Sequence, residues 1–110
     1  MIVKRPSIFI YANNPDKDCL RELCAGIEEE GVHYEVYEKD YADVDTLAHV
    51  AASDSMLGSG IGICRNSVAL QIKGIAKGKN VEFYEIPTLT ECRKLGSNSA
   101  RVIKKMPLNN

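Results

Sequence analysis

The chain has no tryptophan and only two histidines, and its four cysteines include no C-x-x-C pair. These shortages argue against a zinc site, because zinc ligands are Cys and His side chains at short, regular spacings. No apolar run is long enough to span a bilayer, and the first residues lack the apolar segment and small-residue cleavage site of a signal peptide. We therefore expect a cytoplasmic protein with no membrane partner.

The chain also lacks an excess of charge of either sign. The 110 residues carry 14 basic and 15 acidic side chains, for a net charge of -1. This balance gives no electrostatic support for nucleic-acid binding, and no aromatic stacking series is interleaved with the basic residues. A length of 110 residues with 45% hydrophobic side chains predicts one domain, residues 1–110, with a single core.

Residues 14–31 predict one amphipathic helix around which the chain is organised. Asn14 can cap its first turn, and Pro15 suits the first helical position. Gly31 suits a left-handed cap at the other end. Apolar side chains recur at the i, i+3, i+4, i+7 spacing of a face that packs on a core, namely Leu20, Leu23, Cys24 and Ile27.

The last turn of this helix carries three consecutive glutamates, Glu28, Glu29 and Glu30. Carboxylates at this end oppose the helix dipole, at a cost of roughly 0.3–1 kcal/mol each. At about 100° per residue, Glu29 points away from the apolar stripe. Two interpretations remain open. Local sequence favours a solvated acidic helix end, and the alternative is a carboxylate that meets an outside cation, either a metal or a partner's basic group.

The remaining pattern predicts a three-layer α/β domain with a mixed sheet. Strands are expected at residues 7–12, 34–37, 60–64, 68–72 and 81–86. A second helix is expected at 46–53, capped by Asp43 or Asp45, with a short helical turn from Thr88 and a last helix at 100–105 after a break at Gly96. The strand–helix–strand start implies a right-handed parallel crossover. The short turn at 65–67 implies a hairpin, so one strand runs antiparallel to the rest.

Glycines at positions 58, 60 and 62 do not form a phosphate-binding loop, because a strand follows them and no Gly-Lys-Ser/Thr ends the run. They are expected to allow close backbone approach in or before a strand. Residues 73–80 form a basic, glycine-containing loop that could be mobile or contact a partner.

Local motifs for catalysis are missing. No Ser-His-Asp or Cys-His pairing is indicated, and the glutamates have no marked acid/base partner. Cys19 lies near a helix start, where a thiol can acidify, although a buried thiol is the commoner case. The residues favour a binding or assembly module over an enzyme.

Three segments carry a resemblance to a known family: LCAGIEEEGVHYEV at 23–36, GSGIGICRNSVALQIKG at 58–74 and GSNSARVIKKMPL at 96–108. Together they resemble the small subunit of the adenosylcobalamin-dependent diol or glycerol dehydratase reactivating factor. The medium subunit of the dehydratases shares this fold. The resemblance implies a fold like the anticodon-binding domains of some synthetases, with strand order 2-1-3-4-5 and strand 4 antiparallel.

The resemblance also implies a function. The small subunit would be non-catalytic, and its large partner would be a chaperone-like, actin-like ATPase. The small subunit would exchange with the dehydratase medium subunit, so that damaged cobalamin leaves the inactivated holoenzyme.

The resemblance further implies a site. Glu29 would contribute to a divalent cation site, expected to hold Mg²⁺, at the interface with the large subunit. Glu28, Glu30, Asn98 and Arg101 would lie at the same interface, and no catalytic residue or cofactor of the chain's own is expected. Ser97 and Ser99 flank Asn98 where the family tends to show adjacent asparagines, which leaves the client dehydratase open.

Two other functions stay open. One is a medium-subunit-like part of a dehydratase, against which the short chain counts, since medium subunits are expected to carry more sequence before this domain. The other is a small thiol enzyme that uses Cys19. The sequence also leaves open whether the protein enters a bacterial microcompartment.

Overall fold

A computed structural model describes residues 5–40 and 43–109. Over these residues the chain forms five strands and three helices. In chain order they are β1 (Ile8–Asn13), α1 (Lys17–Glu29), β2 (Tyr34–Glu38), α2 (Val44–Asp54), β3 (Ser59–Cys64), β4 (Ser67–Ile72), β5 (Glu82–Glu85) and α3 (Leu89–Ile103).

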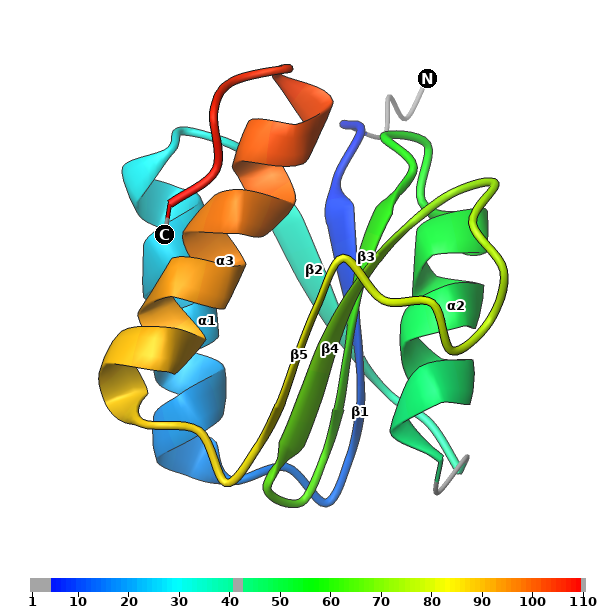
Figure 1. Cartoon of the computed structure of the whole chain (residues 1–110), viewed down its shortest axis with the longest axis vertical. Coiled ribbons are helices and arrows are strands. Elements are labelled where there is room, and N and C mark those ends of the chain that lie inside the picture. Colours follow the sequence, from blue (N-terminus) through cyan, green and yellow to red (C-terminus); the bar gives the residue numbers. More distant parts are fainter. Residues whose placement is uncertain (1–4, 41–42, 110) are drawn as a thin grey trace.

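The strands form one mixed sheet with the order β2-β1-β3-β4-β5 (Figure 1). β1 pairs in parallel with both β2 and β3. β4 pairs antiparallel with β3 and with β5, so it alone runs against the other four strands. The predicted strand order and the antiparallel fourth strand are confirmed.

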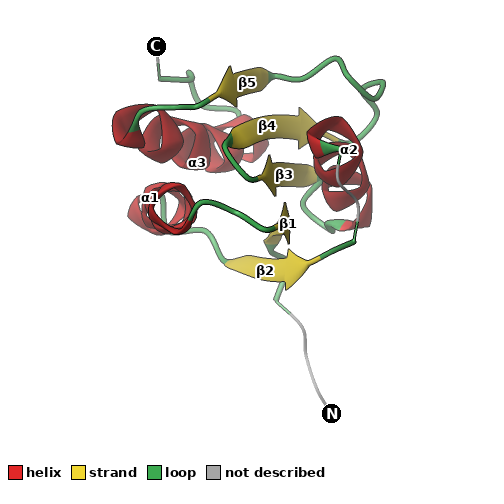
Figure 2. Cartoon of the chain, turned by 90° about the horizontal axis from the view of Figure 1, so that it is seen from below, coloured by secondary structure: helices red, strands yellow, loops and turns green. Residues whose placement is uncertain are grey.

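Helices cover both faces of the sheet in three layers (Figure 2). α1 and α3 lie side by side on one face, and α2 lies on the other. The main core fills the space between the sheet and the α1/α3 layer. Its largest fully buried side chains are Ile8, Ile10, Leu23, Ile27, Ile61, Ile63, Leu70 and Leu95. None of the helices in the described part of the chain is long and apolar enough to cross a membrane.

Two glycines of β3 let α2 lie close to the sheet. A Cβ atom at Gly60 would lie 2.1 Å from the backbone nitrogen of Ala52, and one at Gly62 would lie 2.5 Å from that of Ala48. Real Cβ atoms do not come so close, so these positions accept only glycine without a shift of α2. The prediction of close backbone approach is confirmed here.

The start of α1 differs from the prediction. Asp16 is the N-cap, and its carboxylate accepts the backbone N–H of Cys19 at 3.0 Å. Asn14 instead adopts a left-handed conformation with φ 48°, which asparagine tolerates better than most residues. Pro15 lies before the cap rather than inside the helix. At α2, Asp43 is the cap, which is one of the two predicted residues.

The predicted break at Gly96 is wrong, because α3 runs without interruption from Leu89 to Ile103. Gly96 lies where α3 crosses α1: a Cβ atom there would lie 2.1 Å from the carbonyl oxygen of Leu23. Gly26 of α1 has the reciprocal role, with its missing Cβ 2.2 Å from the carbonyl oxygen of Arg93. Each glycine therefore makes room for the other helix, and Gly96 does not end its own.

The basic loop at residues 73–80 is held by the buried side chain of Gln71. Its Nε2 lies within 3.1–3.2 Å of three oxygen acceptors, on Ala76, Lys79 and Asn80. The loop also reaches the first turn of α2, where Asn80 donates to Asp45 at 2.9 Å. In this structure the loop is therefore anchored at one end of α2.

Candidate partner interface

The three glutamates at the end of α1 meet three different surroundings. The Glu28 carboxylate is exposed and accepts the hydroxyl of Tyr34 at 2.8 Å. The Glu29 side chain is 58% exposed and accepts Nη1 of Arg93 at 3.0 Å. The Glu30 side chain is only 12% exposed, which sets it apart from its neighbours.

Glu30 is the centre of a polar cluster between α1 and α3. Its Oε2 accepts the Ser97 hydroxyl at 2.8 Å and Nε of Arg101 at 3.0 Å, and its Oε1 lies 3.3 Å from Nζ of Lys104. Lys104 also donates to the Glu30 backbone carbonyl at 2.7 Å. The hydrogen bond from Ser97, with those from the two basic side chains, lowers the pKa of Glu30 below its ordinary value, because each favours the charged form.

Arg93 forms a second bridge between the helices. Its Nε donates to Glu22 at 3.1 Å while its Nη1 donates to Glu29. The hydrogen bonds to Glu29 and Glu22 raise the pKa of Arg93. Two of the three carboxylates that oppose the dipole of α1, those of Glu29 and Glu30, are therefore met by cations from α3 and its C-cap in the same chain.

Sequence reasoning missed this basic face of α3. Arg93, Ser97, Arg101 and Lys104 are spaced by four, four and three residues, so they line one side of a continuous helix. The predicted break at Gly96 placed Arg93 in a different element from Arg101 and hid the pattern. A helix kept continuous through Gly96 would have revealed it.

Asn98 and Arg101, the two predicted interface residues on α3, lie beside the end of the described chain. Asn98 is 2% exposed and donates to Glu82 of β5 at 2.8 Å. It also exchanges hydrogen bonds with the backbone of Asn109. Arg101 donates to the backbone carbonyl of Pro107 at 3.1 Å as well as to Glu30.

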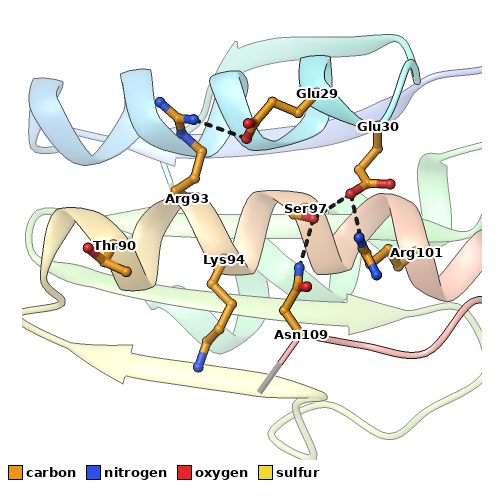
Figure 3. A pocket seen from close by; sticks show the side chains of 8 residues that line it. All are labelled: Glu29, Glu30, Thr90, Arg93, Lys94, Ser97, Arg101 and Asn109. Carbon is orange, nitrogen blue, oxygen red and sulfur yellow. Dashed lines mark hydrogen bonds and ion pairs between the residues drawn. The ribbon is translucent and has the colours of Figure 1, made fainter.

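These groups line an open pocket of about 540 Å³ between the end of α1 and α3 (Figure 3). The lining side chains are Glu29, Glu30, Thr90, Arg93, Lys94, Ser97, Arg101 and Asn109. All of these lining residues are polar or charged, which suits contact with a polar protein surface better than an apolar ligand. The structure thus brings Glu29, Glu30 and Arg101 together, and leaves Glu28 beside Tyr34 and Asn98 beneath the chain end.

The donor set limits what the pocket could do with a cation. In the part of the chain that the structure describes, no three or more His, Cys, Asp or Glu side chains form a group that could hold a metal ion. The exposed Glu29 carboxylate could supply one oxygen ligand, which suits a hard cation such as Mg²⁺. Its remaining ligands would have to be waters or groups of another chain.

The structure removes the support for the thiol-enzyme hypothesis. Cys19 is 4% exposed in the core, and burial, with a contact to Cys92, raises its pKa above the ordinary value. A thiol must ionise to act as a nucleophile, and this one is held neutral and covered.

Comparison with known proteins first identifies the protein family. The sequence model of the dehydratase medium subunit family matches residues 5–109. The chain therefore belongs to the dehydratase medium subunit family.

Individual proteins of known function or structure are also similar to this chain. The chain is 30% identical over 103 residues to the propanediol dehydratase-reactivating factor small subunit of Citrobacter freundii, a match that covers 93% of this chain and 89% of the relative. A solved diol dehydratase-reactivating factor complexed with ADP and Mg²⁺ aligns with a TM-score of 0.89 and 26% identity, over 97% of this chain and 100% of that chain. A glycerol dehydratase reactivase aligns with a TM-score of 0.90 and 25% identity, over 96% and 98% of the two chains. The resemblance noted from three sequence segments is confirmed.

Proposed function

We propose that this chain is the small, non-catalytic subunit of a diol or glycerol dehydratase reactivase. In this role it binds a large ATPase subunit and exchanges with the medium subunit of the dehydratase, which releases damaged cobalamin from the inactivated holoenzyme. We propose that it acts in the cytoplasm. If its client dehydratase is enclosed in a bacterial microcompartment, we propose that the chain acts inside that compartment. The observation that carries the proposal is the match to a reactivating-factor small subunit, at 30% identity over 93% of this chain. The alignment with a solved diol dehydratase-reactivating factor, at a TM-score of 0.89 over 97% of this chain, supports it.

The pocket between α1 and α3 is the proposed interface with the large subunit. Its paired charges leave Glu29 as the accessible carboxylate, while Glu30 is held inside by Ser97, Arg101 and Lys104. In this proposal Glu29 gives one oxygen ligand to an Mg²⁺ ion whose other ligands come from the partner and from water. The diol dehydratase-reactivating factor that aligns with this chain is complexed with ADP and Mg²⁺, which supports a role for this ion in such assemblies.

The decisive experiment is an association assay between this chain and the large reactivase subunit, with and without Mg²⁺. We expect Glu29→Gln to weaken binding by about tenfold and to remove its dependence on Mg²⁺, because one anionic ligand of a shared ion is lost. The melting temperature should be nearly unchanged, since an exposed ion pair is worth roughly 0–1 kcal/mol. Glu85→Gln, an exposed glutamate on β5 outside the pocket, is the matched control.

The outcomes separate two parts of the proposal. If the wild-type chain binds no reactivase large subunit in either condition, the reactivase function is wrong. If it binds but Glu29→Gln leaves both the affinity and the Mg²⁺ dependence intact, the ion does not use Glu29.

A second candidate function is a medium-subunit-like component of an adenosylcobalamin-dependent dehydratase. The observation that favours it is the family itself, which is described by the dehydratase medium subunit. Co-purification with the large and small dehydratase subunits, but not with the large reactivase subunit, would support it. Cobalamin titration of that assembly by absorbance would then show whether the chain helps to hold the cofactor.

A further inference from the structure

The last residues of the described chain fold back onto α3. The backbone N–H of Asn109 donates to Oδ1 of Asn98 at 2.8 Å, and Nδ2 of Asn98 donates to the carbonyl of Asn109 at 3.3 Å. A side-chain amide that both accepts from and donates to one backbone residue imitates the edge of a strand. Asn98 therefore binds main chain, and it does so while 2% exposed.

Two more hydrogen bonds hold this segment, which we call the tail (residues 107–109). Asn109 Nδ2 donates to the Ser97 hydroxyl at 2.9 Å, as Figure 3 shows, and Arg101 donates to the Pro107 carbonyl at 3.1 Å. The tail buries little in return. Leu108 is 39% exposed, and Pro107 and Asn109 are exposed as well. Polar bonds, rather than apolar burial, keep the tail in place.

The residues that hold the tail also hold the acidic end of α1. The Ser97 hydroxyl donates to Glu30 and accepts from the Asn109 side chain of the tail. Arg101 donates to Glu30 through Nε and to the Pro107 carbonyl through Nη1. Asn109 lines the same pocket as Glu29 and Arg93. The tail thus occupies the α3 side of the proposed interface.

We propose that Ser97, Asn98 and Arg101 form a binding notch for extended main chain, which the tail fills in the free chain and an extended segment of the large subunit fills in the complex. This inference rests on the proposed function, and it adds the kind of partner segment and a built-in competitor. The notch forms hydrogen bonds with backbone N–H and C=O groups, so it requires an extended segment rather than a particular side chain. The buried Asn98 amide gives the notch its direction, because it offers one acceptor and one donor to the same residue.

When a segment of the chain itself covers the binding site, the apparent Kd for the partner equals the intrinsic Kd divided by the fraction of molecules whose site is open. If the tail covers the notch in about nine of ten molecules, the apparent Kd is about tenfold weaker than that of a chain without the tail. Loss of the tail should therefore strengthen association, which is the opposite of the usual effect of removing an interface segment.

The test compares four forms of the full chain for their Kd with the large reactivase subunit: wild type, a deletion of residues 107–110, Asn109→Pro and Leu108→Ala. Asn109→Pro, at an exposed position, removes both the N–H that donates to Asn98 and the side-chain amide that donates to Ser97. We expect the deletion and Asn109→Pro to lower the Kd by roughly three- to tenfold. Leu108→Ala, which alters the tail without touching its backbone bonds, should leave the Kd unchanged.

An unchanged or higher Kd for both the deletion and Asn109→Pro, with wild type still binding, would overturn the inference and leave the proposed function standing. If wild type does not bind at all, the proposed function itself fails. Amide hydrogen exchange gives an independent readout: the Asn109 N–H should be protected in the free chain and lose that protection in the complex. Protection that persists in the complex would show that the tail stays in the notch and would also overturn the inference.

Discussion

At the scale of single residues, Glu30 shows how a charge at the wrong end of a helix is made favourable. A carboxylate in the last turn of α1 opposes the helix dipole, yet Ser97, Arg101 and Lys104 surround it. Replacing it by glutamine leaves two basic side chains with a neutral partner. We expect Glu30→Gln to lower the free energy of unfolding by about 1–2 kcal/mol at pH 7. Chemical denaturation with Glu28→Gln as control measures this, since Glu28 sits on the same turn without a basic partner in the described contacts.

The same residue predicts a pH dependence. The folded state lowers the pKa of Glu30 below its ordinary value of 4.5, so its contribution to stability is present above that value and is lost as the pH falls through the lower, folded pKa. The deficit of Glu30→Gln relative to wild type should therefore shrink below about pH 4.5. A deficit that stays constant down to pH 3 would show that the charge of Glu30 is not what stabilises the fold.

The buried thiols make a second prediction at this scale. Burial raises the pKa of both Cys19 and Cys92, which lie where α1 and α3 begin. We expect both to react with a thiol reagent at pH 8 at least about 100-fold more slowly in the native chain than in denaturant. Mass spectrometry of alkylated peptides assigns the sites. Rapid labelling of Cys19 in the native protein would contradict its burial between the helices and the sheet.

At the scale of elements, the crossing of α1 and α3 depends on Gly26 and Gly96. An alanine at Gly96 would gain up to about 1 kcal/mol in helix propensity. Its Cβ, however, would lie 2.1 Å from the Leu23 carbonyl oxygen, so the helices would have to separate. We expect Gly96→Ala to destabilise the fold by roughly 2 kcal/mol or more. Gly31→Ala is the matched control, because nothing lies within 4 Å of its Cβ position and only its φ of 72° is strained.

The two variants are compared by thermal and urea unfolding. A stabilised or unchanged Gly96→Ala would mean that α3 does not approach α1 this closely, and that the glycine reflects a local break after all. Gly31→Ala should cost about 1 kcal/mol through backbone strain alone.

The elements also show which features local sequence could predict. Buried strands such as β1 and β3 are recognisable as short apolar runs between turns, and the hairpin after Cys64 fixed one antiparallel pair. The continuity of α3 was missed because a glycine inside a helix has the same local signature whether it ends the helix or admits a neighbour. Only the position of Leu23, on a helix far away in the sequence, decides between the two. The candidate site was incomplete for the same reason: Glu29 and Glu30 were visible locally, while Arg93 was not connected to them until α3 was continuous.

At the scale of the whole molecule, the charges of this chain are balanced in total and also locally. The net charge is -1, and the acidic end of α1 is matched by Arg93 and Arg101 of α3 and by its C-cap residue Lys104. A protein with so little net field attracts a partner weakly over long distances. The association rate constant with the large subunit should therefore fall less than about threefold between 50 and 500 mM salt, measured by stopped flow at constant Mg²⁺.

Arg93→Gln tests the origin of this behaviour, because it removes one positive charge and leaves Glu22 and Glu29 unmatched. A pocket that is locally acidic should respond to salt more steeply, in a direction set by the charge of the partner surface. Wild-type association that already falls tenfold or more would show that the partner meets an unbalanced charge on this chain, and the proposed local balance at the end of α1 would then not describe the docking surface.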